Sequence, residues 1–217
     1  MKRLIIVCEG ETEQQFCEEL LRNHLFNKSI LMFTPIIKKT NGGICTWSVL
    51  KKQLKCHLNE GQAFVTTFID YYGIKDSYAF PRWIEAKTIE DKYQRMIFLE
   101  NSMLEDMDTS LRTRFIPYLQ LHEFESLLFC NLHAFEDVVP AEDIKDRSAL
   151  EKVLYDYPNP ELINENVSTS PSHRLQHIIN GYVKTIYGAE LAKSIGLYEI
   201  REKCPHFNEW LTTIEAL

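Results

Sequence analysis

The chain has 217 residues, of which 45% are hydrophobic and 12% aromatic, so it can bury the core of one α/β domain with an elaboration, or of two small domains. It contains no stretch of roughly twenty apolar residues that could span a membrane. The acidic residues that closely follow the short apolar run near Met1 argue against a signal peptide. We therefore expect a cytoplasmic protein without a membrane partner.

Charge and cysteine spacing exclude further classes. The net charge of −7 argues against unaided, nonspecific binding to a long nucleic acid. Residues 1–60 hold nine Lys and Arg against six Asp and Glu, so a mildly basic face on an acidic body remains open. The six cysteines include no Cys-x-x-Cys pair, which is not typical of a zinc site, and without an export signal they do not indicate disulfides.

The first predicted strand is Leu4–Cys8, five apolar residues followed at once by Glu9 and a glycine. A short apolar run that ends at a turn signal is typical of a strand buried on both faces in a parallel sheet. Thr12 and Gln15 have the spacing of a capping box, which predicts the start of a helix. Glu9 would then stand at the edge where open α/β sheets bind ligands. Alternatively, Glu9 and Glu13 only favour the positive end of a helix dipole.

Apolar runs and helical periodicity alternate along the chain as far as residue 130. After the first helix, the predicted elements are the strand Ile30–Ile37, the helix Trp47–Leu58, the strand Ala63–Ile69, the helix Thr88–Met107 and the strand Arg114–Leu121. This order implies a parallel sheet with crossover helices. Farther on, the pattern predicts the helices Ser148–Tyr155, Leu175–Ile186, Ala189–Ile195 and Phe207–Leu217, the second and third of them joined through Gly188. We expect an α/β core over residues 1–130 and a mostly helical extension over 131–217, packed on the core.

Acidic side chains follow three of the predicted strands. Glu9 follows the first strand, Asp70 follows Ala63–Ile69, and Glu123 and Glu125 follow the last. Converging carboxylates repel one another, so such a cluster persists mainly where a divalent cation neutralises it. Oxygen ligands favour Mg²⁺, Mn²⁺ or Ca²⁺ over zinc, and a carboxylate-bound Mg²⁺ is the usual apparatus of phosphoryl transfer and phosphodiester cleavage. The sequence therefore predicts a metal site at one edge of the sheet.

Two points about this site stay open in the sequence. His122 is a candidate general base or ligand, but a lone histidine before a helix is more often a cap or a packed residue. Residues two apart on a helix point to different faces, so only one of Glu123 and Glu125 would face the site, with that stretch predicted to begin a helix.

The motifs that carry these residues resemble those of the bacterial DUF4276 family. They are Glu9-Gly10-x-Thr12-Glu13, Asp70-Tyr71-Tyr72-Gly73, His122-Glu123-Phe124-Glu125, Ser170-Pro171-Ser172-x-Arg174, Tyr182-x-Lys184-x-x-x-Gly188 and Cys204-Pro205-His206-Phe207-x-x-Trp210. The resemblance spans nearly the whole chain. The family is similar to Toprim domains, the Rossmann-like, metal-dependent catalytic fold of topoisomerases, primases and OLD-family nucleases.

The resemblance implies roles for individual residues. Glu9 would be a metal ligand or general acid/base, and Asp70 a metal ligand. Tyr72 stands where the Toprim Asp-x-Asp signature has its second acid, so Glu123 or Glu125 would complete the site, which leaves open whether one or two metals bind.

Three further residues are candidates on the same resemblance. Lys184, in the helical extension, resembles a position where a lysine contacts the scissile phosphate, and Arg174 could do likewise. A solvated or structural cation is the alternative for each. Glu13 is a secondary candidate in the first motif.

The function implied is that of a Mg²⁺- or Mn²⁺-dependent nuclease acting on DNA or RNA. Members of the family resemble effector subunits that accompany ABC/SMC-type AAA ATPases in bacterial anti-phage defence. A noncatalytic docking or regulatory subunit of such an ATPase is the alternative. The sequence does not choose between DNA and RNA or between endo- and exonucleolytic cleavage, and a homo-oligomer is left open.

Overall fold

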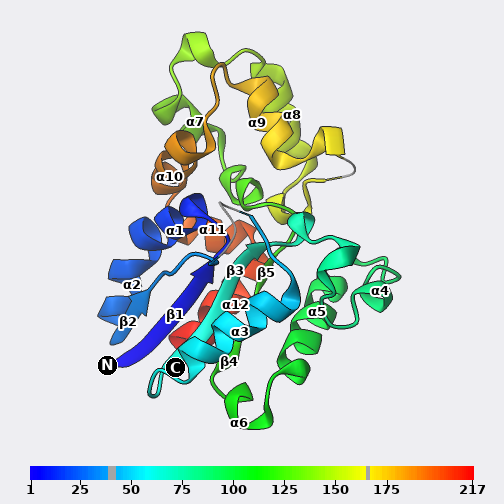
Figure 1. The fold of residues 1–217 in the computed structure, drawn as a ribbon. Helices are drawn as coiled ribbons and strands as arrows, with labels where there is room; N and C mark the ends of the chain where they lie inside the picture. The colour runs from blue at the N-terminus through cyan, green and yellow to red at the C-terminus, as the bar shows by residue number, and fades with distance from the viewer. Residues whose placement is uncertain (39–42, 165–166) are drawn as a thin grey trace.

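The computed structural model describes residues 1–38, 43–164 and 167–217 (Figure 1). Its centre is a parallel sheet in the order β2-β1-β3-β4, and β5 pairs with the last two residues of β3. The strands are β1 (Lys2–Cys8), β2 (Ile30–Phe33), β3 (Phe64–Asp70), β4 (Phe115–Ile116) and β5 (Leu119–Gln120). The predicted α/β fold, a mainly parallel sheet flanked by helices, is confirmed.

Helices cover both faces of the sheet and continue beyond its carboxyl edge, where α7 to α10 gather (Figure 1). The helices are α1 (Glu11–Phe16), α2 (Arg22–Asn27), α3 (Trp47–Leu58), α4 (Trp83–Ala86), α5 (Lys92–Asp106), α6 (Thr109–Arg112), α7 (Leu132–Val138), α8 (Arg147–Asp156), α9 (Pro171–Ile178), α10 (Lys184–Ile195), α11 (Leu197–Lys203) and α12 (Pro205–Glu215). Within the described residues, no helix is long and apolar enough to cross a membrane.

The apolar run of β1 is explained by its burial on both faces. Leu4 and Ile6 belong to a core that also contains residues of α1, α2 and α10 to α12. Ile5 and Val7 belong to a second core, with residues of α3 and α5. Alternate residues of a strand point to opposite faces, so a strand covered on both sides is apolar throughout.

The last helix, α12, packs directly on the central strand β3. The Trp210 indole stacks on Phe68, with ring centroids 5.5 Å apart, and its Nε1–H donates to Thr66 Oγ1 at 2.8 Å. Helices from residues 131–217 thus share one core with the sheet. The division at residue 130 stays a prediction.

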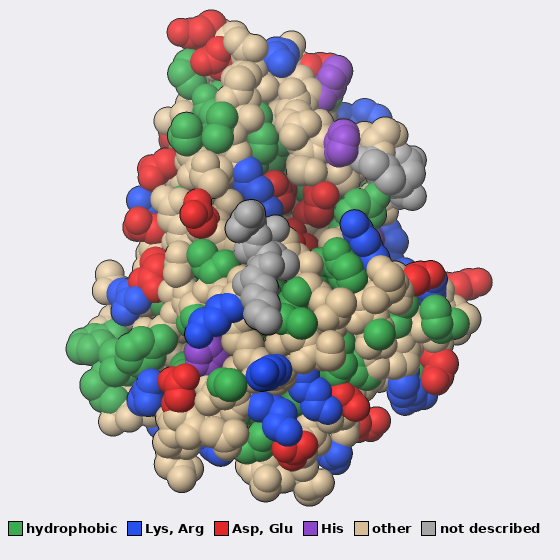
Figure 2. Space-filling model, viewed as in Figure 1, with side chains coloured by type: hydrophobic (Ala, Val, Ile, Leu, Met, Phe, Trp, Pro, Cys, Tyr) green, Lys and Arg blue, Asp and Glu red, His purple; other side chains and the backbone are tan. Residues whose placement is uncertain are grey.

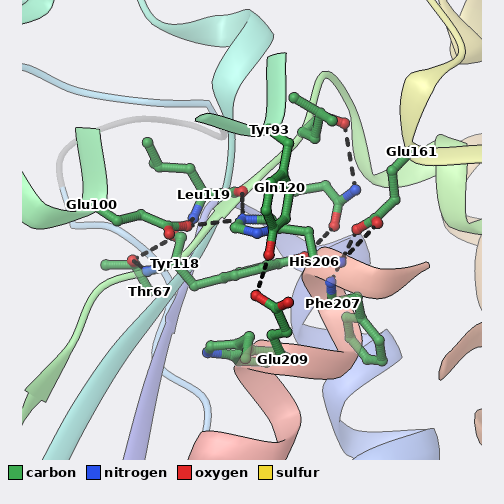
Figure 3. A network of polar contacts seen from close by, with 12 residues as sticks. Thr67, Tyr93, Glu100, Tyr118, Leu119, Gln120, Glu161, His206, Phe207 and Glu209 are labelled. Carbon is green, nitrogen blue, oxygen red and sulfur yellow. Dashed lines mark hydrogen bonds and ion pairs between the residues drawn. The ribbon is translucent and has the colours of Figure 1, made fainter. Parts of the chain in front are cut away.

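A buried polar network joins α12 to α5 and β5 (Figure 3). His206 Nε2 lies 3.0 Å from Glu100 Oε1 and 3.2 Å from the Leu119 carbonyl oxygen. The Glu161 carboxylate accepts the backbone N–H groups of His206 and Phe207, each at 3.0 Å. These are N–H groups at the start of α12, which have no acceptor within the helix. Glu161 therefore caps α12 and fixes where it begins.

Two predicted strands are shorter in the structure because of prolines. The strand predicted over Ile30–Ile37 ends at Phe33, before Pro35, and Ile36 makes only an isolated bridge to Cys8. The strand predicted over Arg114–Leu121 is divided into β4 and β5 at Pro117. Proline has no N–H to donate to a neighbouring strand, so pairing is interrupted there.

Several helix boundaries also differ from the prediction. The helix predicted from Thr88 begins at Lys92, after its cap Asp91. The stretch after Glu123 forms a 3₁₀ turn, η4 (Phe124–Leu128), in place of an α-helix.

The prediction of a helix over Leu175–Ile186 is wrong. Helix α9 ends at Ile178, and α10 begins at Lys184. Gly181 lies between them with a φ of +66°, which a helix does not accommodate. Gly188, predicted to join two helices, lies inside α10.

Candidate functional site

The carboxyl edge of the sheet gathers four carboxylates, those of Glu9, Glu13, Asp70 and Glu125, here called the carboxylate cluster. Glu9 follows β1, Glu13 lies in α1, Asp70 ends β3 and Glu125 lies in η4 after β5. Lys184, the first residue of α10, reaches into the cluster. Its Nζ lies 3.0 Å from Glu13 Oε1, 3.2 Å from Glu125 Oε2 and 3.9 Å from Asp70 Oδ2.

Backbone N–H groups orient three of these carboxylates. Glu9 Oε2 accepts the N–H of Asp70 at 2.9 Å, and Asp70 Oδ1 accepts the N–H of Phe124 at 2.9 Å. Glu13 Oε2 accepts the N–H of Gly10 at 2.9 Å. The cap of α1 is therefore Gly10 with Glu13, whereas the Thr12 and Gln15 pair predicted as a capping box does not start this helix.

Glu125 differs from the other three acids. The residue is 2% exposed, and its Oε2 accepts no hydrogen bond within the described part of the chain, so the ion pair with Lys184 is the polar contact of that oxygen. Burying a carboxylate oxygen without a hydrogen bond is costly unless a cation lies close to it. The Lys184 ammonium meets that need here.

Burial of the acids sets their proton affinities. Burial raises the pKa of Glu9 to about 7, although the hydrogen bond from Asp70 opposes the rise. Burial also raises the pKa values of Asp70 and Glu125 against the opposing effect of Lys184. For Lys184, burial alone would lower the pKa, but the attraction of Asp70, Glu13 and Glu125 raises it well above its usual value. Three acids contact the one ammonium and Glu9 lies beside them, so acidic groups outnumber cations in the cluster.

The donor set suits a hard divalent cation, since every ligand candidate in the cluster offers carboxylate oxygen. The arrangement is not preassembled, however. The described residues contain no group of three or more His, Cys, Asp and Glu side chains positioned to hold a metal ion. A cation would have to enter among acids that contact Lys184 in this structure.

A close approach between helices brings Lys184 to the acids. Gly188 lies one turn after Lys184 on α10, and a Cβ atom added there would lie 3.2 Å from Thr12 Cγ2 and 3.3 Å from Phe124 Cε1. The lack of a side chain at Gly188 lets α10 lie this near to α1 and η4 without displacing Thr12 or Phe124. The four-residue spacing from Lys184 to Gly188 is the sequence signal for this contact.

The structure separates Glu123 from Glu125. Glu123 Oε2 accepts the backbone N–H of Ser172 at 2.9 Å and so holds the first turn of α9, whereas Glu125 contacts Lys184. Tyr72 is 38% exposed, and its backbone N–H donates to the His122 carbonyl oxygen at 3.0 Å. The roles predicted for Glu123 and Tyr72 stay predictions.

Arg174 lies outside the carboxylate cluster. Its guanidinium stacks on the Tyr157 ring at 5.6 Å, and its Nε–H donates to the Thr169 carbonyl oxygen at 2.8 Å. No ion pair joins it to a carboxylate of the described residues. A phosphate bound by Arg174 would therefore contact a different surface from one bound by Lys184.

His122 is buried and strained. It is 6% exposed, has a left-handed φ of 69°, and neither ring nitrogen has a hydrogen-bond partner in the described ranges. Burial lowers the pKa of His122 to about 3, helped by repulsion from Lys92 and Arg95. The imidazole is thus neutral at neutral pH. Strained backbone of this kind occurs often at functional sites, and its role as base or ligand stays a prediction.

Fold and site together define an α/β protein with a carboxylate cluster at the carboxyl edge of a parallel sheet. The chain belongs to the DUF4276 family, described as "Domain of unknown function (DUF4276)", whose profile matches residues 8–215. This confirms the family predicted from the motifs. Comparison with curated proteins gives no significant match.

Two solved structures of the C-terminal region of the OLD protein of Xanthomonas campestris pv. campestris are similar to the chain. One, phased with platinum, is 16% identical, with a TM-score of 0.43, and the match covers 98% of this chain and 95% of that one. The other, phased with mercury, is 16% identical, with a TM-score of 0.39 and 98% coverage of both chains. Likeness at this level does not by itself indicate a shared activity.

Proposed function

We propose that the protein is a Mg²⁺- or Mn²⁺-dependent nuclease that hydrolyses phosphodiester bonds of DNA or RNA. The observation that carries this proposal is the gathering of four carboxylates at the carboxyl edge of the sheet, three of which contact one lysine. Open α/β sheets bind their ligands at that edge. The motif resemblance to Toprim domains and OLD-family nucleases supports the same chemistry.

The residues of the cluster have distinct parts to play in such a reaction. Glu9, Asp70 and a carboxylate after β5, from Glu125 or Glu123, would hold the metal ion, which supplies positive charge to the phosphate oxygens. With a pKa of about 7, Glu9 can take up or release a proton near neutral pH. Lys184 brings a second positive charge that a phosphate group can approach, because its side chain is 35% exposed.

The test is cleavage of supercoiled plasmid and of total tRNA in Mg²⁺ and in Mn²⁺. Asp70→Asn removes the charge but keeps an Oδ1 that accepts the N–H of Phe124, so the fold should persist. We expect Asp70→Asn and Glu9→Gln to cut at least roughly 100-fold more slowly. Glu11→Gln is the matched control, since Glu11 is an exposed acid in the first turn of α1. Wild-type rates in both cluster variants, or a metal-free wild type that cuts equally well, would contradict the proposal.

We further propose that an ABC/SMC-type AAA ATPase is the partner, within a bacterial anti-phage defence system. The family resemblance supports it, and so does the net charge of −7, since a partner would then supply much of the attraction to nucleic acid. The cleavage assay is therefore run with and without the ATPase and nucleotide. Cleavage by the chain alone at an unchanged rate would remove the need for such a partner.

A noncatalytic docking subunit of the same ATPase is the second candidate. It is favoured by the lack of a preassembled metal-binding group among the described residues and by the exposed Tyr72 at the position of the second Toprim acid. Full biological activity of both Asp70→Asn and Glu9→Gln, with intact assembly, would establish this alternative.

A further inference from the structure

A pocket lies between α8 and α9, away from the carboxylate cluster. Its volume is about 220 Å³. Cationic and imidazole side chains line it together with apolar ones: Lys152, His173, Arg174, His177, Val153 and Ile178. It is called the α8–α9 pocket below.

Arg174 gives this pocket its strongest anion-binding group. Its Nε–H is used by the Thr169 carbonyl oxygen, and the Tyr157 ring holds the guanidinium plane. Its two terminal amino groups contact no acceptor in the described part of the chain. By contrast, Arg147 and Arg201 both pair with glutamates. In an acidic protein, an oriented arginine that no described carboxylate neutralises suits an external anion.

The histidines add donors on the same side. His173 Nδ1 lies 3.0 Å from Ser170 Oγ, and Ser170 is 1% exposed, so this contact fixes the ring and leaves Nε2 for an outside acceptor. His177 is exposed, 77% by its side chain, with its Nε2 3.9 Å from Asp146 Oδ2, which leaves Nδ1 as its other donor. Asp156 is the carboxylate that lines the pocket, and its Oδ2 is already paired with Lys152 Nζ at 2.8 Å. The polar lining therefore favours an anion.

The pocket is linked to the candidate active site through α9. The first turn of α9 is held by Glu123, which lies two residues before Glu125 of the carboxylate cluster. Figure 2 shows histidine side chains over α8 and α9, on the same face as charged side chains near the carboxyl ends of the strands. A polymer bound at the cluster can thus continue toward the pocket across one face of the molecule.

We propose that the α8–α9 pocket binds a backbone phosphate of the nucleic acid substrate, one that flanks the phosphodiester bond at the carboxylate cluster. This rests on the proposed nuclease function. The Arg174 fork matches two phosphate oxygens, and His173 and His177 donate from beside it. Val153 and Ile178 give the sugar an apolar wall. A pocket of about 220 Å³ equals roughly seven waters of about 30 Å³ each, enough for a phosphate with part of its sugar.

The contact is to the sugar–phosphate backbone of the nucleic acid, so it positions the nucleic acid strand without reading the base sequence. Binding is measured by fluorescence anisotropy with labelled single-stranded DNA and RNA oligonucleotides in Mg²⁺. All proteins carry Asp70→Asn to prevent cleavage. We expect Arg174→Met to weaken binding about tenfold and to lower the slope of log K against log salt by about one. The DNA and RNA arms show which backbone is preferred.

Two further variants separate this role from a general charge effect or from misfolding. Lys193→Met removes a positive charge on α10, where Lys193 pairs with Glu19 and Glu190, and should leave binding unchanged. His177→Gln alters an exposed side chain and should weaken binding about threefold. Each variant is checked by thermal melting.

If Arg174→Met and His177→Gln bind like Lys193→Met, the pocket proposal is wrong, whatever the plasmid assay shows. The nuclease proposal is judged separately, by metal-dependent cleavage with Asp70 intact. If the protein with Asp70 intact cuts plasmid, and Arg174→Met binds the oligonucleotides as tightly as the protein with Arg174, the nuclease proposal holds and only the pocket proposal is wrong.

Discussion

Lys184 is the residue on which the charge balance of the carboxylate cluster depends. Without its ammonium, Glu125 Oε2 would lose its ion pair and Glu13 and Asp70 would face each other uncompensated. We expect Lys184→Met to lower the free energy of unfolding by about 1–2 kcal/mol at pH 8 in the presence of a chelator. This lies below the usual cost of breaking a fully buried pair, because Lys184 is 35% exposed. Urea denaturation measures it.

The pH dependence gives this prediction its specificity. Glu9, with a pKa of about 7, is largely protonated at pH 5, so less negative charge is then left unbalanced and the loss in Lys184→Met should shrink. Lys193→Met, at an exposed ion pair, should show neither the loss nor the pH effect. An equal loss at pH 5 and pH 8 would mean that Lys184 acts through packing.

At the scale of elements, apolar runs are sufficient to predict a parallel sheet and the position of its acidic edge. Continuous runs such as Leu4–Cys8 are buried on both faces, and the acids after them necessarily share one edge of a parallel sheet. Local pattern does not show that α10 begins at Lys184. From the sequence, Gly188 is predicted to lie between two helices. In the structure it lies inside α10, where its lack of a side chain allows close packing against Thr12 and Phe124.

The same tertiary contact explains what the sequence could not show of the site. Glu123 and Glu125 are equivalent in a local pattern, and the choice between them is made by two distant groups, the N–H of Ser172 and the ammonium of Lys184. Arg174 is likewise placed by Tyr157 and not by its own motif. Their placement depends on how α9 and α10 pack, which no short motif encodes.

The Gly188 contact predicts how α10 responds to substitution. In Gly188→Ala, the tight contacts at 3.2 and 3.3 Å are offset by about 1 kcal/mol of helix propensity, so little net change is expected. Gly188→Val adds two more methyl groups and should destabilise the fold by about 1–3 kcal/mol. It should also slow cleavage by displacing Lys184. Glu190→Val, at an exposed position inside the same helix, is the control for β-branching. Denaturation curves that coincide for Gly188→Val and Glu190→Val would contradict the close approach.

For the whole molecule, buried acids dominate the dependence of stability on pH. Burial raises the pKa of Glu161 to about 7, despite the nearby His206, and burial raises that of Glu9 equally. Each then keeps a proton in the folded state between about pH 4.5 and 7, where the unfolded chain has released it. The stabilising contribution of each of these two acids is therefore fully present below about pH 4.5 and is lost as the pH rises through 7. The pKa of His122 is lowered to about 3, so this group makes the free energy of unfolding rise with pH up to about pH 6.5.

The acids outnumber this histidine, so the free energy of unfolding should be lower at pH 7 than at pH 5. Glu161→Gln isolates one contribution, because the amide keeps an oxygen for one N–H of α12 but does not titrate. Its absolute stability falls at pH 5, where one N–H of the network loses its acceptor (Figure 3). Between pH 5 and 7, however, the free energy of unfolding of Glu161→Gln should fall less steeply with pH than that of the wild type. The difference should reach up to about 1.4 kcal/mol per pH unit, which is the effect of one proton. Glu142→Gln, at an exposed acid, should keep the wild-type slope. Urea denaturation across this range decides the matter, since identical slopes in wild type and Glu161→Gln would mean that Glu161 is already ionised at pH 5 and that its two N–H bonds outweigh its burial.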